Sequence, residues 1–535
     1  MKDKLKNDPE YRNRFTVAVL LAVLILAQTA IYVVAGTRKS YIHMDEGYSF
    51  ALASYHSVEI NTNADFYDTW HDKDYYLDYL VLNENERGDL SPVYWNQVND
   101  NHPPLFYLIL RFAMNFTVGR FSVWPGIVIN IAVYAFVTIF SYLILAKLFE
   151  GHKHRRLKAA VLAFLASVTL SSVSNVIYVR MYAMSALNVL IALYLHLCLR
   201  ERFRVRTLIF IGLAALVGSL THYFYLFFLL MLFLMTAIGY LRRKEYRHAL
   251  WYFLALCAAA GVSLAIFPYS IKHIFFGYRG TGVIGNLTDL GHLSVTLLRP
   301  FRYFDVAIHH VYHYVLVGML LACIPLAILN KTKKAEKPAF SMYFKYLWAP
   351  TLFFFLVTAV AAPYIELRYL APACIPLYFI AVYLFATLLK TLIGEKKTVV
   401  AVCAILAVSI AVPFIFGIEP QETYSDKKEI VRELEGEKNL PTVYWFNSEN
   451  DRFLDDILLF SRIDESYVAK DPACTPETVR SILEGKDISR GVILFINRDQ
   501  NEEEIFRAFR DGAGLGNVTM LKAMNACEIY YLLPE

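Results

Sequence analysis

Hydrophobic segments of about 20 residues recur along this chain from Phe15 to about Gly417, with short charged connections between them. A helix needs about 20 apolar residues to cross the hydrocarbon core of a bilayer, so this repeat places most of the chain in a membrane. Composition agrees, since 57% of the 535 residues are hydrophobic. The chain is therefore predicted to be an α-helical polytopic membrane protein. About eleven spans are expected, near residues 15–36, 124–149, 158–177, 181–199, 206–221, 224–241, 249–270, 307–330, 345–363, 370–392 and 397–417.

Basic residues gather in clusters beside these predicted spans. The clusters are Lys2 to Arg14, His152 to Lys158, Arg200 to Arg206, Arg242 to Arg247, Lys331 to Lys337, and Lys396 with Lys397. Cytoplasmic loops carry an excess of Lys and Arg, and all of these clusters fall on one side if the apolar stretch Pro103 to Val118 does not cross. That stretch is predicted to be a re-entrant or surface-lying helix. We expect a multi-pass protein of the cell membrane, with its N-terminus in the cytoplasm and its C-terminal region outside.

Composition divides the chain into regions. We expect residues 1–14 to be cytoplasmic, 15–417 to form a transmembrane domain, and 418–535 to form a small extracytoplasmic α/β domain. Residues 37–102 form an acidic first outer loop, with twelve Asp or Glu against four Lys or Arg. In the tail, TVYWFN, SYVAK, GVILFIN and CEIYYLL are predicted strands. No glycine-rich nucleotide motif follows a strand, and the net charge of +5 reflects the cytoplasmic bias, so neither a cofactor nor nucleic acid is expected.

An acidic pair, Asp45 and Glu46 in HMDEGYSF, follows the first predicted span. A carboxylate at a membrane surface is partly desolvated yet still meets a water-borne substrate, so it can act as a base. A solvated acidic pair is the alternative interpretation. We identify Asp45 and Glu46 as candidate catalytic residues.

The outer loop closes with DNHPPLFYLIL, in which Asp100 and His102 precede two prolines. Pro103 and Pro104 lack backbone donors and have a fixed φ, which suits the first turn of a helix that enters an apolar medium. Asp100 and His102 are thereby placed at the mouth of that helix, where they are candidate substrate-binding residues. Capping of the helix by Asp100 or Asn101 is the alternative.

Two arginines are predicted to lie at the outer ends of spans, away from the side where positive charge is expected. They are Arg180 in YVRMYAMSAL and Arg368 in ELRYLAPACIPLY. A guanidinium there requires an anionic partner and binds phosphate bidentately, so the pair suits a phosphate clamp; snorkelling to lipid phosphates is the alternative. The histidine cluster HHVYHY is interpreted as interfacial, and no metal site is predicted. Further candidate substrate-binding residues are Tyr182, His222, Arg302 and Tyr369.

The ordered set HMDEGYSF, DNHPPLFYL, YVRMYAMSAL, THYFYLFFLL and ELRYLAPACIPLY resembles the glycosyltransferase C superfamily. The nearest likeness is to bacterial membrane enzymes related to protein O-mannosyltransferases and the lipid A aminoarabinose transferase. It covers about residues 10–395. The resemblance implies that Asp45 is the catalytic acid of the first outer loop and that Pro103 and Pro104 match the proline pair at its end. The aminoarabinose transferase pattern has a lysine just before these prolines, where this chain has His102.

The resemblance implies a polyprenyl-phosphate sugar donor and a lipid, glycan or protein acceptor. Asp45 would accept the proton of the acceptor hydroxyl as its oxygen attacks the anomeric carbon, with inversion, while arginine or His102 stabilises the departing phosphate. A polytopic secondary transporter or flippase of an anionic or lipid-linked substrate is the alternative, although its sites would lie near the bilayer midplane. A non-catalytic scaffold that presents the tail to a partner is a third reading. Ionisable residues at span ends favour the enzyme.

Overall fold

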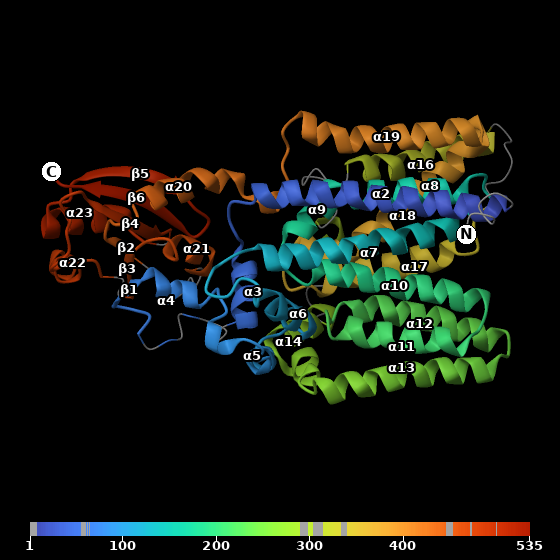
Figure 1. Ribbon diagram of the computed structural model, residues 1–535, viewed down its shortest axis with the longest axis horizontal. Coiled ribbons are helices and arrows are strands. Elements are labelled where there is room, and N and C mark those ends of the chain that lie inside the picture. The colour runs from blue at the N-terminus through green and yellow to red at the C-terminus, as the bar shows by residue number, and fades with distance from the viewer. Residues whose placement is uncertain are drawn as a thin grey trace. The chain divides into compact units, whose positions relative to one another are not determined.

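The computed structural model describes residues 8–54, 60, 63, 65–288, 298–302, 314–332, 340–445, 453–470, 473–498 and 500–535. The chain forms two compact units (Figure 1). The helical unit comprises Met1–Thr37, Asp100–Phe106 and Gly126–Pro420. The α/β unit comprises Arg38–Asn99, Tyr107–Pro125 and Gln421–Glu535.

The helical unit is built from apolar helices that run side by side (Figure 1). They are α2 (Pro9–Arg38), α7 (Trp124–Leu148), α8 (Arg155–Ser167), α9 (Leu170–Ile177), α10 (Tyr182–Glu201), α11 (Val205–Ser219), α12 (Tyr225–Arg242), α13 (Tyr246–Ile266), α16 (Tyr314–Thr332), α17 (Phe344–Ala361), α18 (Ala371–Ile393) and α19 (Glu395–Ile415). The same unit contains the short α14 (Tyr278–Thr288). A π-helical turn, η3 (Lys272–Phe276), precedes α14, and a 3₁₀ turn, η5 (Leu367–Leu370), precedes α18. Within the described ranges, nine helices are long and apolar enough to cross a membrane, which confirms the predicted multi-pass class.

Two further predicted spans correspond to shorter or bent helices. Helices α8 and α9 bend by 58° where they meet, and together they occupy the predicted span 158–177. The 15-residue α11 occupies the predicted span 206–221. The stretch that was predicted not to cross forms α6 (Leu105–Met114). Ten helical residues reach about 15 Å, half of the roughly 30 Å of hydrocarbon in a bilayer, so α6 is too short to cross.

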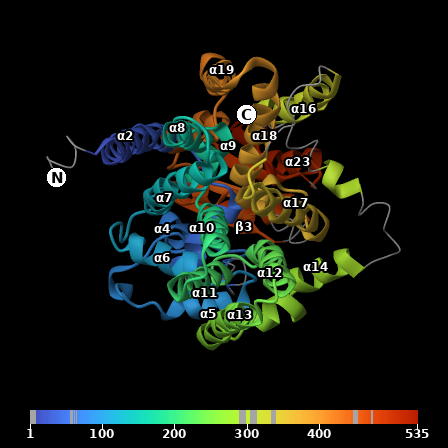
Figure 2. The ribbon, with the colours of Figure 1, turned by 90° about the vertical axis from the view of Figure 1, so that its right-hand side faces the viewer.

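Helices α10 and α18 form the centre of the helical unit. In the most apolar 18-residue stretch of each, 72% is buried inside the protein, compared with 11–22% of the corresponding stretches of α2, α13, α16 and α19. Figure 2, a view along the helices, shows α10 between α7, α11 and α12, with α13 and α19 toward the outside. The residues that begin α10 and α18 are therefore packed among other helices rather than exposed to lipid.

Helices α10, α12 and α18 begin at the same end of the helical unit (Figure 1). We call this the site end. The basic clusters that follow α10 and α12 lie at the opposite end, which we call the basic end. The separation is the one expected if the basic end faces the cytoplasm.

The α/β unit contains a six-stranded sheet in the order β1-β3-β2-β4-β6-β5. Its strands are β1 (Trp70–Asp72), β2 (Thr442–Trp445), β3 (Glu465–Ala469), β4 (Val492–Asn497), β5 (Asn517–Ala523) and β6 (Cys527–Leu533). Strands β3, β2 and β4 are parallel, and the other pairs are antiparallel. Strands β2, β3, β4 and β6 confirm the predicted strands. Strand β1 comes from the first outer loop, so loop and tail share one sheet.

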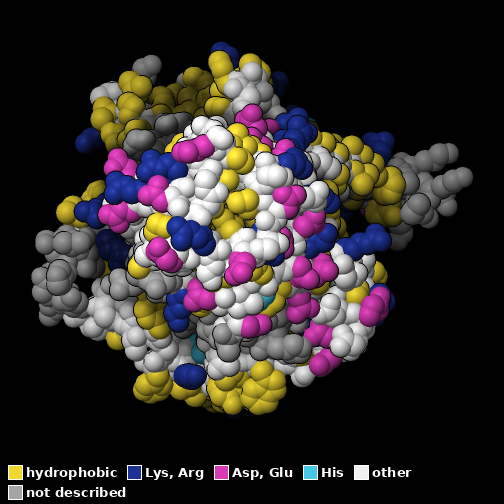
Figure 3. Space-filling view, turned by 90° about the vertical axis from the view of Figure 1, so that its left-hand side faces the viewer, with side chains coloured by type: hydrophobic (Ala, Val, Ile, Leu, Met, Phe, Trp, Pro, Cys, Tyr) yellow, Lys and Arg dark blue, Asp and Glu magenta, His cyan; other side chains and the backbone are white. Residues whose placement is uncertain are grey.

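Alternating side chains of β2 give the sheet two different faces. On one face, Trp445 packs with Phe509 and the other apolar residues of the helices that cover it. On the other, Tyr444 stacks on Phe460, whose ring also contacts Tyr76. The helices of this unit are α3 (Met44–Ser54), α4 (Lys73–Asp78), α5 (Ser91–Asn99), α6 from Tyr107 on, α20 (Lys428–Gly436), α21 (Ile457–Phe460), α22 (Pro476–Leu483) and α23 (Glu502–Ala513). Figure 3 shows acidic and basic side chains interspersed over its surface, as in a water-exposed domain.

Candidate functional site

His102 lies between an acid and an arginine at the site end of the helical unit. Its Nδ1 is 2.7 Å from Asp100 Oδ2, and its Nε2 is 3.4 Å from Arg180 Nη2. A guanidinium can only donate, so Nε2 accepts from Arg180 and the Nδ1 N–H donates to Asp100. Three residues predicted to bind substrate thus form one hydrogen-bonded chain, in which the tautomer of His102 is defined.

Aromatic contacts join the starts of three helices beside this chain. Tyr182 is the first residue of α10 and is 2% exposed. Its ring centroid is 5.6 Å from that of His222, which precedes α12, and 6.4 Å from that of Tyr369, which precedes α18. The structure therefore brings Tyr182, His222 and Tyr369 together. All three are predicted substrate-binding residues.

The pKa values at the site end favour a neutral imidazole and an ionised carboxylate. Burial lowers the pKa of His222 to about 3, and the charge of Arg180 acts in the same direction. Because His222 Nδ1 accepts from the backbone N–H of Phe224, its neutral ring carries the proton on Nε2. Burial alone would raise the pKa of Asp100, but His102 and Arg180 outweigh it, so that pKa lies below its usual range.

Positive potential converges on this group of residues. A helix N-terminus carries roughly half a positive charge, and α10, α12 and α18 all begin here. Arg180 adds a full charge and is only 4% exposed. Backbone N–H groups at helix starts together with a buried guanidinium suit a phosphate, toward which neutral His222 can also donate from Nε2.

An apolar recess opens beside these residues, between α11, α12 and α13. It encloses about 620 Å³ of space free of protein atoms, part of which is open to solvent. Tyr223, the neighbour of His222, stands at its polar margin, with its hydroxyl 3.0 Å from His273 Nδ1. The walls are mostly hydrocarbon and include Leu226, Leu229, Leu256, Ala260 and Leu264. We call it the site-end recess; such a shape suits the apolar tail of an amphiphile whose head is anionic.

The two remaining candidate arginines lie in different surroundings. Arg368 is in η5, where its Nη1 is 3.8 Å from Glu366 Oε2 and its guanidinium lies 5.9 Å from the Tyr369 ring. Arg302 is exposed and precedes residues 303–313, which lie outside the described ranges. The histidines of HHVYHY fall in that undescribed segment.

The acidic pair of the first outer loop lies in the α/β unit, in the first turn of α3, where the two side chains differ. Asp45 is 16% exposed, and its Oδ2 is 3.8 Å from His43 Nδ1. Glu46 is fully buried and accepts hydrogen bonds from Lys39 Nζ at 3.0 Å and from the backbone N–H of His43 at 2.9 Å. Asp45 is thus accessible to solvent, whereas Glu46 is internal.

Lys39 is a residue of this neighbourhood that the sequence analysis did not single out. Its side chain is 1% exposed, donates to the Glu422 carbonyl oxygen at 2.8 Å, and lies 4.9 Å from the Tyr424 ring. Together with its bond to Glu46, these contacts tie the start of α3 to the chain that follows α19. Lys39 lies just outside the first span, on the predicted acidic side, where basic residues are few, and that position could have identified it.

Comparison with known proteins places the fold. The structure of ArnT from Cupriavidus metallidurans bound to undecaprenyl phosphate aligns with 96% of this chain and 97% of its own, with a TM-score of 0.54 and 9% identity. The chain has the glycosyltransferase C fold. AglB, an archaeal oligosaccharyltransferase from Archaeoglobus fulgidus, aligns with 97% of the chain and 74% of its own, at a TM-score of 0.44 and 11% identity. No protein-family model and no curated protein sequence matches the chain. This fold was predicted from the ordered motifs.

Proposed function

We propose that this chain is a membrane glycosyltransferase that moves a sugar from a polyprenyl-phosphate donor to an extracytoplasmic acceptor. The observation that carries the proposal is the hydrogen-bonded chain Asp100–His102–Arg180 at the start of α10, with neutral His222 beside it. The fold supports it, because ArnT, whose fold this chain shares, was crystallised with undecaprenyl phosphate. The charge and shape of the site end supply an argument that does not depend on that likeness.

The donor phosphate is assigned to the site end of the helical unit. Arg180 pairs with its oxygens, and His222 Nε2 donates a further hydrogen bond without carrying a charge. Asp100 keeps His102 in the tautomer that accepts from Arg180, so it orients the guanidinium rather than contacting the phosphate. Arg368 and Tyr369, in η5 before α18, are assigned to the same headgroup.

The polyprenyl tail is assigned to the site-end recess. A chain tens of carbons long is stabilised by about 0.8 kcal/mol for each buried CH₂ group, so its affinity depends on an apolar surface next to the headgroup. Leu226 and Leu229 line that surface within two turns of His222. Tyr223 marks the boundary between polar and apolar parts.

Asp45 is assigned the role of general base. The acceptor oxygen forms a bond to the anomeric carbon, its proton passes to Asp45, and the bond from that carbon to the phosphate oxygen breaks. The electron pair leaves with the polyprenyl phosphate, and attack from the opposite face inverts the configuration. Base catalysis contributes roughly 10²- to 10⁴-fold, so phosphate stabilisation and positioning supply the remainder. Glu46 is assigned a supporting role, because it is buried against Lys39.

Transfer by the purified chain in proteoliposomes tests the proposal. Lipid extracts from cells with and without the gene, compared by mass spectrometry, first identify the sugar lipid that accumulates when the gene is absent. The wild-type chain should then transfer labelled sugar from that lipid, and Asp45→Asn should abolish transfer because an amide cannot accept the proton. Asp74→Asn, which changes an exposed acid of the same loop, is the matched control. Movement of the lipid across the bilayer without sugar transfer would instead identify a flippase.

A further inference from the structure

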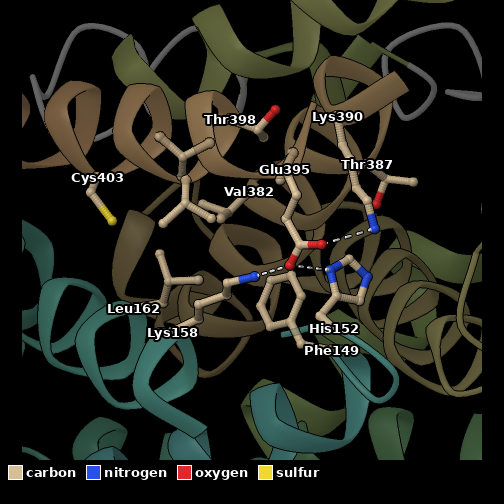
Figure 4. Close-up of a pocket in the computed structure, with 13 residues that line it drawn as sticks. Phe149, His152, Lys158, Leu162, Val382, Thr387, Lys390, Glu395, Thr398 and Cys403 are labelled. Atoms are coloured by element: carbon tan, nitrogen blue, oxygen red, sulfur yellow. Dashed lines mark hydrogen bonds and ion pairs between the residues drawn. The ribbon is translucent and has the colours of Figure 1, made fainter. Parts of the chain in front are cut away.

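A second recess lies in the helical unit at its basic end, between α8, α18 and α19 (Figure 4). It encloses about 500 Å³ of space free of protein atoms, part of which is open to solvent. The proposed transfer reaction uses none of its residues. One side of its rim is charged, and its inner wall is hydrocarbon.

The charged rim is organised around Glu395, the first residue of α19. Figure 4 shows three basic side chains directed at its carboxylate. Lys158 of α8 forms a short ion pair with it, Lys390 Nζ of α18 lies at 3.5 Å, and His152 Nδ1 lies at 3.7 Å. These side chains are 12–39% exposed, so the rim is in contact with solvent.

The rim carries an excess of positive charge. Burial, with Lys390 acting in the same direction, lowers the pKa of His152, so this imidazole is neutral at physiological pH. Two ammonium groups then face one carboxylate. A monoanion placed between Lys158 and Lys390 would complete the neutralisation of the rim.

The inner wall continues from this rim along α19. Leu162, Val382 and Val402 line it, and Cys403 stands at the far end. From Glu395 to Cys403 the helix rises by about 12 Å, slightly more than two turns. The recess therefore combines a cationic end with an apolar track, the two features of a site for a molecule with an anionic head and a hydrocarbon tail.

We propose that the basic-end recess binds one anionic phospholipid of the membrane leaflet at that end. Its phosphate lies between Lys158 and Lys390, and one acyl chain lies along Leu162, Val382 and Val402. Charge selects the lipid. A phosphatidylglycerol headgroup carries one net negative charge, which balances the one excess positive charge of the rim. A zwitterionic headgroup carries no net charge and does not balance it.

Binding to the purified full-length chain, measured by native mass spectrometry with phosphatidylglycerol or phosphatidylethanolamine, tests the proposal. The wild-type chain should retain one phosphatidylglycerol in preference to phosphatidylethanolamine. Lys390→Gln should weaken phosphatidylglycerol binding roughly 3- to 10-fold, because one partly exposed charged contact is lost. Glu395→Gln should strengthen it, because the competing carboxylate is removed.

Matched variants separate the site from general effects. Lys147→Gln breaks the 2.5 Å ion pair with Glu201, elsewhere in the same unit, and should leave lipid binding unchanged. Val399→Trp narrows the apolar wall without changing charge and should weaken binding of phosphatidylglycerol. Each variant must elute as a single species and unfold at the wild-type temperature without added lipid; one that does not is replaced by Lys390→Met or Val399→Phe.

A chain that keeps Cys403 as its sole cysteine localises the lipid. Bound phosphatidylglycerol should slow the reaction of Cys403 with N-ethylmaleimide, and inorganic phosphate should not. Equal protection by inorganic phosphate would overturn the lipid assignment in favour of a simple anion site. Preference for phosphatidylethanolamine, or weaker binding after Glu395→Gln, would also overturn the proposal.

Discussion

Removing one charge of the buried Lys39–Glu46 pair should destabilise the α/β unit strongly. Both side chains are at most 1% exposed, and their charged atoms are 3.0 Å apart. Glu46→Gln preserves the shape of the acid but leaves the ammonium of Lys39 buried with only neutral partners. Removing one member of a buried ion pair costs about 3–5 kcal/mol, chiefly because the remaining charge is uncompensated.

The Glu422 carbonyl and the Tyr424 ring stay close to Lys39 in this variant. Since both favour a cation, we expect the cost of Glu46→Gln to lie near the lower limit, about 3 kcal/mol. Lys39→Met removes the ammonium beside the buried Glu46 carboxylate, whose bond from the His43 N–H remains, and should also destabilise the unit. The double variant Lys39→Met/Glu46→Gln leaves no uncompensated charge, so it should cost at least 2 kcal/mol less than the sum of the single changes.

Urea-dependent thiol labelling reports this energy within the α/β unit. Cys527 of β6 is fully buried, so in a chain with no other cysteine it reacts only when the unit opens. The midpoint of labelling should fall in both single variants and recover in the double variant. Additive losses, or a Glu46→Gln chain as stable as wild type, would refute the ion-pair reasoning.

Two further predictions concern pH and topology. Burial beside Asp455 raises the pKa of Asp456 to about 7, so its stabilising contribution is complete below its ordinary pKa of 3.8 and is lost as pH rises through 7. The α/β unit should therefore be less stable at pH 8 than at pH 5, by about 2.5 kcal/mol, and Asp456→Asn should flatten this slope in urea titrations. In intact cells, single cysteines at Asn83 and Ser489 should react with an impermeant thiol reagent while one at Arg247 does not; labelling of Arg247→Cys alone would reverse the predicted orientation.

Elements whose pattern is local were predictable from the sequence. The spans were located because bilayer thickness fixes the length of an apolar helix, and strands β2, β3, β4 and β6 because apolar runs bounded by turns are distinctive. Strand β1 has three residues and pairs with β3, which follows about 400 residues later, so no local pattern marks it. Strand β5 was missed because its side chains are mostly exposed, which removes the alternation that identifies a half-buried strand.

The candidate site was predictable in part for the same reason. Successive spans cross the membrane in opposite directions, so helices α10 and α12, separated by α11, run the same way. Arg180 and His222, which precede these two helices, are therefore expected on the same side of the membrane. The direction of the spans does not predict that His102 accepts from Arg180, because that contact depends on how the segment before α6 packs against the start of α10. The sequence also does not distinguish Glu46 from Asp45, because both are acids in the same loop. The structure distinguishes them, since Glu46 is buried in an ion pair with Lys39.

The affinity of the purified chain for the polyprenyl-phosphate donor, measured for Arg180 variants, decides whether the site end binds the donor phosphate. Arg180→Lys keeps the charge but loses the planar pair of donors, so binding should weaken, and Arg180→Ala should weaken it further, by roughly 10- to 150-fold. Arg204→Ala, at an exposed arginine of the basic end, should leave the affinity unchanged. Donor affinity that is the same for arginine, lysine and alanine at residue 180 would contradict the assignment of the phosphate to the site end.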